Sequence, residues 1–456
     1  MSPTPVIAIF DVGKTNKKIF LFDEQYKIVY DETHQIEETK DEDNFACEDV
    51  DALTKWVKSS FEKLLNNKNF RIKAVNFSGY GASFVYLDKS GKVIAPLYNY
   101  LKPYPPVLQQ KFYTDYGGES IVAKQTASPI LGSLNSGMQL YRLKYDKPEV
   151  FALIKYALHL PQYLSYVICS AVNSDITSIG CHTNLWDFQK NTYHRWVEQE
   201  GILSKLAPLK KSTEVAGYIE NTIPVGVGLH DSSAALIPYL HSFSGPFILL
   251  STGTWCISLN PFNHSPLTDH ELQHDCLCYL SYEGKPVKAS RLFAGYEHEQ
   301  QVKRLSAHFN KSMEYYKKVK PDLELIKNIS AYNISLKETR NENIARQSSL
   351  INMDLNEFRN YEEAYHQLIL NLIVEQVQSL NLVLRETAVK QIFVDGGFSE
   401  NPLYMQLLAQ ACSEAKIYSA SVAQASALGA ALAFQKHWDS QPFSSTTINL
   451  QLINRS

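Results

Sequence analysis

The sequence predicts a mixed α/β protein that folds as two or three domains. Three observations support this class: the composition is that of an ordinary globular protein, short apolar runs alternate with longer stretches of helical spacing, and glycine turns directly follow several of the apolar runs. The chain has 456 residues. At about 150 residues per domain, this length corresponds to about three domains or two large ones.

Composition excludes several classes of protein. The 44 Lys and Arg residues against 47 Asp and Glu residues give a net charge of −3, which offers no basic surface for nucleic acid or an anionic membrane. No stretch reaches the roughly 18 consecutive apolar residues of a membrane span, and the first residues lack a signal-peptide pattern. The seven scattered cysteines predict free thiols in a reducing compartment. We therefore expect a cytoplasmic protein, monomeric or homodimeric, without nucleic-acid or membrane partners.

The elements of the first half follow from apolar spacing. Alternating and apolar runs in the first thirty residues predict a β-meander, and Leu53, Trp56 and Phe61 share one side of a helix. In chain order we expect strands at 6–10, 18–22 and 27–30, a helix at 47–66, a strand at 72–77, a hairpin at 88–91, a helix-rich middle at 136–169, a strand at 223–227 and a short helix at 232–240.

The second half begins after a Ser/Pro/Gly linker that precedes an apolar strand at 247–250. We place the main boundary in this linker, giving domains at 1–242 and 243–456. The second domain contains a polar, Lys/Asn/Ser-rich insertion at about 303–350. A long amphipathic helix at 362–386, a strand at 391–394 and small-residue helices through Phe434 complete it.

Two glycine turns form a faint internal repeat. Asp11-Val12-Gly13-Lys14-Thr15 and Ser251-Thr252-Gly253-Thr254 each follow an apolar strand, one in each half. Gly13 permits a tight turn whose backbone N–H groups can hold phosphate oxygens. Thr15, Asn16, Lys14 and Lys18 offer further donors or positive charge, and Asp11 offers a carboxylate for Mg²⁺. The alternative is a hairpin turn with solvated lysines.

Two more segments carry candidate chemistry. Asp395-Gly396-Gly397 lies between a strand and a helix, where paired glycines allow close approach of a flat ring or ribose. The alternative is a glycine turn that merely connects the strand to the helix. Gly228-Leu229-His230-Asp231-Ser232 places a carboxylate where a strand becomes a helix. Asp231 can accept the proton of an attacking hydroxyl during phosphoryl transfer, or serve only as a helix cap.

In combination, these segments resemble the FGGY family of carbohydrate kinases. The resemblance runs from about Val6 to Phe434, nearly the whole chain, and lies closest to the rhamnulokinase and fuculokinase branch. The matching segments, in the family's order, are Asp11–Lys18, Ser78–Asp88, Pro96–Tyr100, Ser174–Thr177, Gly228–Ala235, Ser251–Trp255, Asp395–Gln406 and Ala425–Ala433.

The resemblance implies an α/β, two-domain actin-like fold, with a ribonuclease-H-like sheet in each domain and ATP in the cleft between them. It implies that Asp231 is the general base and that Asp11 helps to place Mg²⁺. It also implies a set of binding residues: Thr15, Asn16 and Thr254 for phosphates, Gly295, Gly396 and Gly397 beside the nucleotide, and Gly81, His230 and Ser232 in the sugar pocket.

Three departures from the family pattern concern specificity. Lys14 stands where the family has Thr, Ser or Ala, and we hypothesise that its charge strengthens ATP binding or neutralises the transition state. Ser83 stands where the rhamnulokinases carry Asp, which changes the hydrogen bonds offered to a sugar. The Tyr98–Lys102 segment lacks the acidic and arginine residues common in the family.

We therefore expect an ATP-dependent kinase for a small ketose, with a deoxyketose such as L-rhamnulose or L-fuculose as the first candidate. The alternatives are another FGGY substrate (xylulose, ribulose or glycerol) and a non-catalytic ATP-binding protein on the same fold. A zinc site in Asp269–Cys278, which contains two His and two Cys, is disfavoured because Cys-x-Cys is not a usual zinc knuckle.

Overall fold

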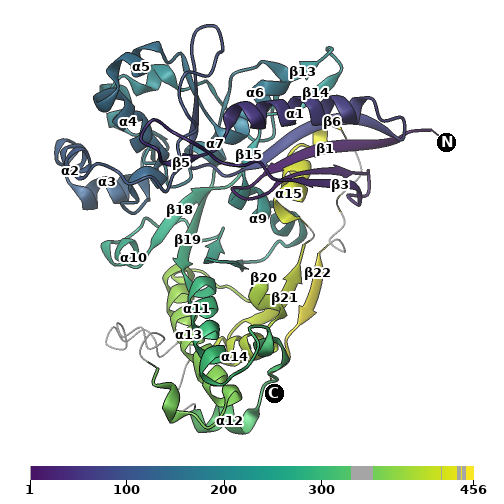
Figure 1. The fold of residues 1–456 in the computed structure, drawn as a ribbon, viewed down its shortest axis with the longest axis vertical. Coiled ribbons are helices and arrows are strands. Elements are labelled where there is room, and N and C mark those ends of the chain that lie inside the picture. Colours follow the sequence, from purple (N-terminus) through teal and green to yellow (C-terminus); the bar gives the residue numbers. More distant parts are fainter. Residues whose placement is uncertain (1, 330–352, 423, 439–442, 444–447, 456) are drawn as a thin grey trace.

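The computed structural model describes residues 2–329, 353–422, 424–438, 443 and 448–455. It contains two seven-stranded sheets, one in each half of the chain, with helices packed on both (Figure 1). The N-terminal sheet and its helices form the upper part of the view, and the C-terminal sheet and helices form the lower part.

The N-terminal sheet has the order β13-β14-β6-β1-β2-β3, and β15 also pairs with β6. Its central strand β1 pairs in parallel with β6 and antiparallel with β2. Both faces of β1 are buried because Ile7 and Ile9 pack on one side and Val6, Ala8 and Phe10 pack on the other. The strands are β1 (Thr4–Val12), β2 (Lys17–Phe22), β3 (Ile28–His34), β6 (Phe70–Gly79), β13 (Val215–Ile219), β14 (Ile223–Gly226) and β15 (Leu229–His230).

The C-terminal sheet has the order β18-β19-β17-β16-β20-β21-β22. Its strands are β16 (Phe247–Thr252), β17 (Cys256–Asn260), β18 (Cys276–Leu280), β19 (Pro286–Leu292), β20 (Gln391–Gly396), β21 (Lys416–Ser421) and β22 (Asn449–Leu452). The path β19-β17-β16-β20-β21 repeats β3-β2-β1-β6-β14, with three antiparallel strands followed by two parallel ones. The faint sequence repeat thus corresponds to a repeated sheet topology.

Helices cover the sheets and fill the middle of the first half. In the N-terminal half they are α1 (Val50–Leu65), α2 (Pro106–Asp115), α3 (Glu119–Thr126), α4 (Ser136–Asp146), α5 (Pro148–Leu153), α6 (Leu160–Cys169), α7 (Ile176–Ile179), α8 (Arg195–Gln199) and α9 (Asp231–Ser242). In the C-terminal half they are α10 (Asp269–Gln273), α11 (Ala294–His308), α12 (Leu323–Ile329), α13 (Tyr361–Leu384), α14 (Pro402–Ala411) and α15 (Ala425–Ala433).

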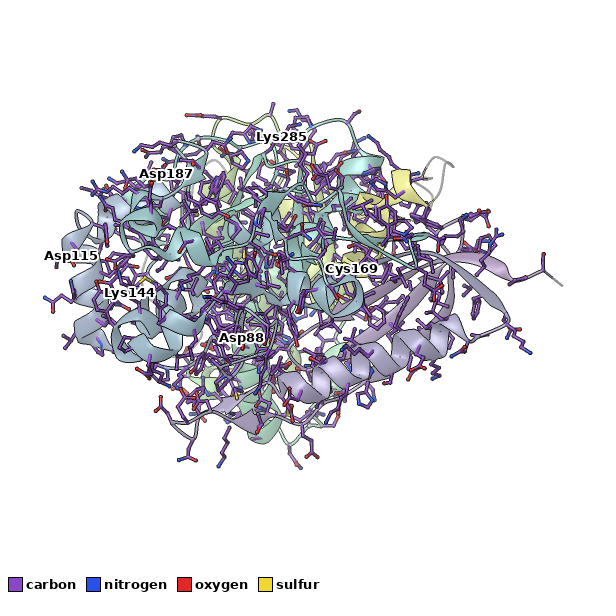
Figure 2. All side chains as sticks on the ribbon, turned by 90° about the horizontal axis from the view of Figure 1, so that it is seen from above. Asp88, Asp115, Lys144, Cys169, Asp187 and Lys285 are labelled. Carbon is purple, nitrogen blue, oxygen red and sulfur yellow. The ribbon has the colours of Figure 1, made fainter. Side chains whose placement is uncertain are left out.

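Short strand pairs connect these helices. They are β4 (Thr39–Lys40) with β5 (Ala46–Cys47), β7 (Phe84–Leu87) with β8 (Tyr156–His159), β9 (Ser174–Asp175) with β12 (Leu209–Lys210), and β10 (Trp186–Asp187) with β11 (Thr192–Tyr193). Charged side chains such as Asp115 and Lys285 lie at the periphery in the view from above (Figure 2).

One core lies between the two sheets and is shared by both halves. It joins Ile9 of β1 and Leu249 of β16 through apolar residues of α9 and α15. The two helices approach so closely that a Cβ on Gly429 would lie 1.8 Å from the Ala234 carbonyl oxygen. The side-chain amide of Asn76 in β6 donates to the Ala430 carbonyl at 2.8 Å. The C-terminal helix α15 therefore packs against the N-terminal sheet, as Figure 1 also shows.

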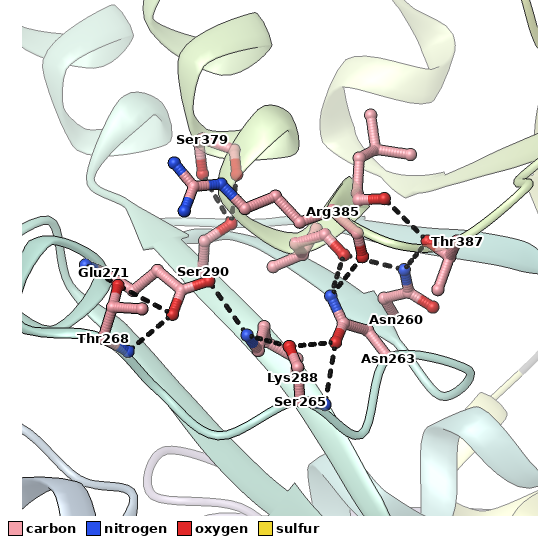
Figure 3. A network of polar contacts seen from close by, with 12 residues as sticks. Asn260, Asn263, Ser265, Thr268, Glu271, Lys288, Ser290, Ser379, Arg385 and Thr387 are labelled. Carbon is pink, nitrogen blue, oxygen red and sulfur yellow. Dashed lines mark hydrogen bonds and ion pairs between the residues drawn. The ribbon is translucent and has the colours of Figure 1, made fainter. Parts of the chain in front are cut away.

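The edge strand β18 forms a second bridge between the halves. Its Cys278 and Leu280 N–H groups donate to the carbonyls of Ala127 (2.9 Å) and Gly180 (3.1 Å). These hydrogen bonds leave fewer unpaired backbone groups along the edge of β18. Beside β18, Lys288 and Glu271 form a buried ion pair at 2.9 Å. Ser265 and Thr268 join this pair to the loop before α10, and Ser290 of β19 separately contacts Ser379 of α13 (Figure 3).

Most expected elements are present with longer bounds. The expected helix at 232–240 is α9, which already begins at Asp231. The expected helix at 362–386 is α13, which is long and apolar enough to cross a membrane but lies in the core of the C-terminal half. The expected hairpin at 88–91 is present as a turn closed by one antiparallel bridge between Leu87 and Val93, and the rest of β7 pairs with β8. The expected polar insertion includes the end of α11 and α12, and its residues 330–350 lie outside the described residues.

Candidate active site

The candidate site lies where three neighbouring strands of the N-terminal sheet end. Asp11 of β1 is opposite Ser78 of β6, and His230 of β15 is opposite Gly79. Because these strands are parallel, their carboxyl ends open on the same edge, which is where α/β sheets bind ligands. The site therefore combines β1, β6, β15 and the first turn of α9.

Asp231 is the first residue of α9, and the capping position belongs to His230. The interpretation of Asp231 as the helix cap is therefore wrong. Its Oδ1 accepts hydrogen bonds from the Ser232 N–H (2.6 Å) and hydroxyl (3.3 Å), and lies 3.4 Å from His230 Nε2. Burial raises the pKa of Asp231, although 34 % of the side chain remains exposed. The carboxylate is thus both partly desolvated and accessible, as a general base requires.

Asp11 faces the same site from β1. Its Oδ2 accepts a hydrogen bond from the Ser426 hydroxyl of α15 at 2.9 Å. Burial, together with the negative charge of Asp231, raises the pKa of Asp11 to about 6. Two nearby carboxylates in a desolvated site attract a divalent cation, because the cation relieves both the burial and the repulsion.

The Gly13 turn is held in shape by a buried lysine. Lys17 Nζ donates to the carbonyls of Gly13 (3.1 Å) and Lys14 (2.9 Å) and pairs with Glu48 Oε1 at 2.7 Å. Lys17 is fully buried at the start of β2, opposite Val12, and it was not predicted as part of the site because no local sequence pattern marks it. The alternative of a turn with only solvated lysines is wrong at this residue.

The other polar residues of the turn point in different directions. Lys14 forms an ion pair with Glu38, and Asn16 Oδ1 accepts from Gln35 at 3.1 Å. Thr15 is exposed, and Lys18 Nζ donates to Gln424 Oε1 at 3.3 Å, close to α15. For Lys14 to approach a phosphate, its ammonium group would have to leave Glu38.

The predicted sugar residues are divided between two places. Gly81 lies directly against His230, because a Cβ at Gly81 would be 2.8 Å from His230 Cδ2. Ser232 lies beside Asp231. Ser83 is buried, and its hydroxyl donates to the Tyr98 carbonyl at 2.7 Å. In this structure the proton of the Ser83 hydroxyl is therefore used in a hydrogen bond to the backbone.

Several neighbours of His230 were not predicted from the sequence. The His230 N–H donates to the Thr177 hydroxyl at 2.9 Å, and Thr177 in turn donates to the buried carboxylate of Asp175. Cys181 Sγ would lie 3.0 Å from a Cβ on Gly81, and the Tyr279 ring is 5.5 Å from the His230 ring. Ser174–Thr177 was singled out as a segment, but the role of Thr177 depends on the fold of α7 against β15.

The second glycine turn lies at the end of β16 in the C-terminal sheet. Gly295 approaches it so closely that a Cβ would be 1.8 Å from the Gly253 carbonyl oxygen. The Tyr296 N–H donates to the Thr254 carbonyl at 3.2 Å, so the start of α11 is fixed on this turn. The structure therefore brings together Thr254 and Gly295, which are forty-one positions apart in the chain.

The glycine pair after β20 lies on the neighbouring strand. Gly396 has φ +89°, and a Cβ there would be 2.0 Å from the Thr252 carbonyl oxygen, so this position requires glycine. Gly397 has open space where its side chain would be. The Thr252 hydroxyl donates to the Asp395 carbonyl at 2.6 Å and accepts from the Phe398 N–H at 3.0 Å. These contacts align the ends of β16 and β20.

The fold and site define a class: a two-domain protein with a repeated sheet, a glycine turn in each half and a carboxylate pair at the sheet edge. Residues 6–237 match the model of the N-terminal domain of the FGGY family of carbohydrate kinases, and residues 244–442 match that of the FGGY C-terminal domain. The chain therefore belongs to the FGGY family of carbohydrate kinases.

Individual relatives are distant. A rhamnulokinase from Mannheimia succiniciproducens is 24 % identical over 263 residues, 55 % of this chain and 52 % of that protein. The match thus spans about half the length of this relative. A crystal structure of a carbohydrate kinase from Novosphingobium aromaticivorans has a TM-score of 0.78 and 21 % identity, covering 100 % of this chain and 95 % of that one. A ligand-bound xylulose kinase from Lactobacillus acidophilus has a TM-score of 0.79 and 15 % identity, covering 99 % and 94 %. The predicted two-domain actin-like kinase fold is confirmed.

Proposed function

We propose that the protein transfers the γ-phosphoryl group of ATP to a hydroxyl of a small ketose. The observation that carries this proposal is Asp231, a desolvated yet accessible carboxylate at the edge where β1, β6 and β15 end. Asp231 takes the proton from the attacking hydroxyl, which becomes a better nucleophile as the phosphoryl group is transferred. Ser232 orients the carboxylate, because its N–H and its hydroxyl both donate to Asp231 Oδ1.

Asp11 is the proposed Mg²⁺ ligand. Mg²⁺ prefers oxygen donors and usually binds through one or two carboxylates together with water and phosphate oxygens. Asp11 accepts a hydrogen bond from the Ser426 hydroxyl and lies near Asp231, so the two carboxylates offer such donors. When bound, the ion supplies charge neutralisation for the phosphates.

ATP is proposed to occupy the space bordered by the two glycine turns. Lys14, Thr15, Asn16 and Lys18 would contact phosphates from the N-terminal half. The residues proposed on the C-terminal side are Thr254, Gly295, Gly396 and Gly397. The open space at Gly397 supports this, because a ligand can approach the backbone there where a side chain would otherwise stand.

For the sugar we propose a deoxyketose such as L-rhamnulose or L-fuculose, with Gly81, Ser83, His230, Asp231 and Ser232 as the pocket residues. The rhamnulokinase relative supports this substrate, whereas the xylulose kinase structure favours xylulose as the second candidate. A coupled assay of ADP release over a panel of ketoses and polyols separates the two. A rate with xylulose that exceeds those with both deoxyketoses would replace the first candidate by the second.

Asp231→Asn tests the assignment of the base. We expect kcat to fall by about 10²- to 10⁴-fold, because the amide cannot accept the proton, while sugar binding measured by calorimetry is retained. Glu119→Gln is the matched control, since it removes an exposed carboxylate from the first turn of helix α3. Near-normal turnover of Asp231→Asn would refute the role of the base, and ATP binding without turnover on any sugar would favour a non-catalytic protein.

The domain division is proposed at residue 242, with the sugar and phosphate site in residues 1–242 and the nucleotide site in residues 243–456. We also propose a cytoplasmic protein, monomeric or homodimeric. The buried or half-buried state of the seven free cysteines supports a reducing compartment.

A further inference from the structure

Three side chains behind the catalytic carboxylate form a cluster that the proposed reaction does not explain. Cys181, His182 and His230 each place one ligand atom within 4.8 Å of the others. Their exposed fractions are 0 %, 7 % and 4 %, so all three are buried. We call this group the Cys–His cluster.

Hydrogen bonds fix how the two imidazoles are oriented. His182 Nδ1 lies 3.1 Å from the Leu134 carbonyl, which can only accept, so Nδ1 carries the proton and Nε2 keeps a lone pair. The Ser233 hydroxyl donates to the Leu280 carbonyl at 3.1 Å, which leaves its oxygen as the acceptor for His230 Nδ1 at 3.5 Å. This favours the same form for His230. Imidazoles that bind metals are typically held in this way, by a hydrogen bond from the other ring nitrogen.

The inferred protonation of His230 places two hydrogen-bond acceptors opposite each other, an arrangement that a cation would stabilise. In this form its Nε2 lone pair lies 3.4 Å from Asp231 Oδ1, so two acceptors face each other. A proton donor, such as a sugar hydroxyl, or a metal ion between them would turn this repulsion into attraction.

Cys181 adds a soft donor to the cluster. Its Sγ has weak contacts, 3.5 Å from the Ser178 carbonyl and 4.0 Å from the Gly81 carbonyl. Thiolate and imidazole are the ligands that Zn²⁺ selects, whereas Mg²⁺ selects oxygen. Three protein ligands and one water complete a tetrahedral zinc site. The cluster and the Asp11 site therefore differ in the metal that they favour.

We propose that Cys181, His182 and His230 bind one Zn²⁺ ion, and that this ion inhibits the kinase by withdrawing His230 from the sugar. A Zn–S bond forms, the S–H bond of Cys181 breaks, and its proton passes to the solvent. One proton is therefore released for each ion bound. The inhibition rests on the proposed function, whereas the binding itself does not.

Binding is tested directly with Co²⁺ as a spectroscopic substitute and Zn²⁺ as its competitor, on the metal-stripped full-length protein. We expect a thiolate-to-cobalt charge-transfer band at one equivalent, lost on addition of Zn²⁺. Calorimetry of Zn²⁺ binding in buffers of different ionisation enthalpy should give one proton released per ion. Cys181→Ser should abolish the band, and His182→Gln should weaken zinc binding by about 10- to 100-fold or more.

Two matched controls test other thiols and histidines. Cys169→Ser removes a half-buried thiol at the end of α6, and His274→Ala removes the histidine that caps the C-terminus of α10. Both should keep the band and the affinity of the unsubstituted protein. If Cys181→Ser does not fold, as judged by its circular dichroism, His182→Gln is compared with the unsubstituted protein in its place.

Inhibition is measured with the ketose of the panel that gives the highest rate. Zn²⁺ should raise the apparent KM for this sugar in the unsubstituted protein. In Cys181→Ser, the ratio of the KM with zinc to the KM without zinc should be much closer to one. Absence of the charge-transfer band, or an unchanged band in Cys181→Ser, would overturn the site. Zinc binding without an effect on the sugar KM would overturn the inhibition. If no sugar supports turnover while the band is present, the kinase proposal fails and the metal site stands.

Discussion

At the scale of single residues, two carboxylates of the site have different surroundings. Asp231 accepts hydrogen bonds from Ser232 and has an exposed side that a substrate can reach. Asp11 accepts from Ser426, and burial together with the charge of Asp231 raises its pKa to about 6. The same residue type can therefore serve as a base in one position and as a cation ligand in the other.

The raised pKa of Asp11 predicts a pH-dependent stability. Between its unfolded value of 3.8 and its folded value of about 6, the folded protein binds more protons. The contribution of Asp11 to the free energy of unfolding therefore decreases as pH rises through this window. We expect Asp11→Asn to be more stable than the unsubstituted protein by about 1 to 3 kcal/mol at pH 7, and equally stable near pH 3.5.

Urea unfolding at a series of pH values between 3.5 and 7, in the absence of Mg²⁺ and nucleotide, measures this difference. Asp31→Asn is the control, because Asp31 is exposed on β3 and should give a difference near zero throughout. A difference for Asp11→Asn that does not change with pH would show that Asp11 is not desolvated.

At the scale of elements, the packing of α9 on α15 places the candidate base. Asp231 is at the start of α9, and the small residues Ala234 and Gly429 let α15 approach. Ser426 at the beginning of α15 also reaches Asp11. The contact between α9 and α15 therefore links the helix that carries Asp231 to the side chain that orients the Asp11 carboxylate.

Gly429→Ala tests this contact. A methyl group at 429 would lie 1.8 Å from the Ala234 carbonyl oxygen, so one helix has to move. We expect a loss of about 1 to 3 kcal/mol in the free energy of unfolding, and a decrease in kcat larger than the change in ATP affinity. Gly245→Ala is the control, since that position has open space. Unaltered stability and kcat would show that the helices tolerate separation.

The helices and strands themselves were largely predictable from apolar spacing, because burial on one face imposes a period. The meander β1–β2–β3 and the helices α1 and α13 are examples. The site was predictable to a lesser extent. Asp11 and Asp231 stand at strand ends in the sequence, but Lys17 and Cys181 carry no local pattern that marks them as neighbours of the site. Their roles come from contacts with residues distant in the chain.

At the scale of the molecule, the two halves share one core and are linked by β18. Residues of both sheets and of α9 and α15 belong to the same apolar cluster. The edge of β18 donates to Ala127 and Gly180, and Asp269 of α10 pairs with Lys124 of α3 at 3.1 Å. Any movement of the halves against each other has to occur around these contacts.

This shared core predicts that the two halves unfold together. Removing either half would expose the apolar cluster of the other, so an intermediate with one folded half is unstable. We expect coincident urea transitions for two single-tryptophan variants, one retaining Trp56 in α1 and the other retaining Trp255 near Thr254. The far-ultraviolet circular dichroism should follow the same curve. Two separate midpoints would contradict this prediction.

The sequence by itself determined the class of fold, the family resemblance and the two carboxylates, because strand length, glycine turns and a charged residue at a strand end are local properties of the chain. The tertiary structure decided which partners these residues have. It paired Lys14 with Glu38, committed Ser83 to a backbone carbonyl, and brought Cys181 and His182 to His230. These contacts join residues that are far apart in the chain, and only the packing of the sheets and helices brings them within bonding distance.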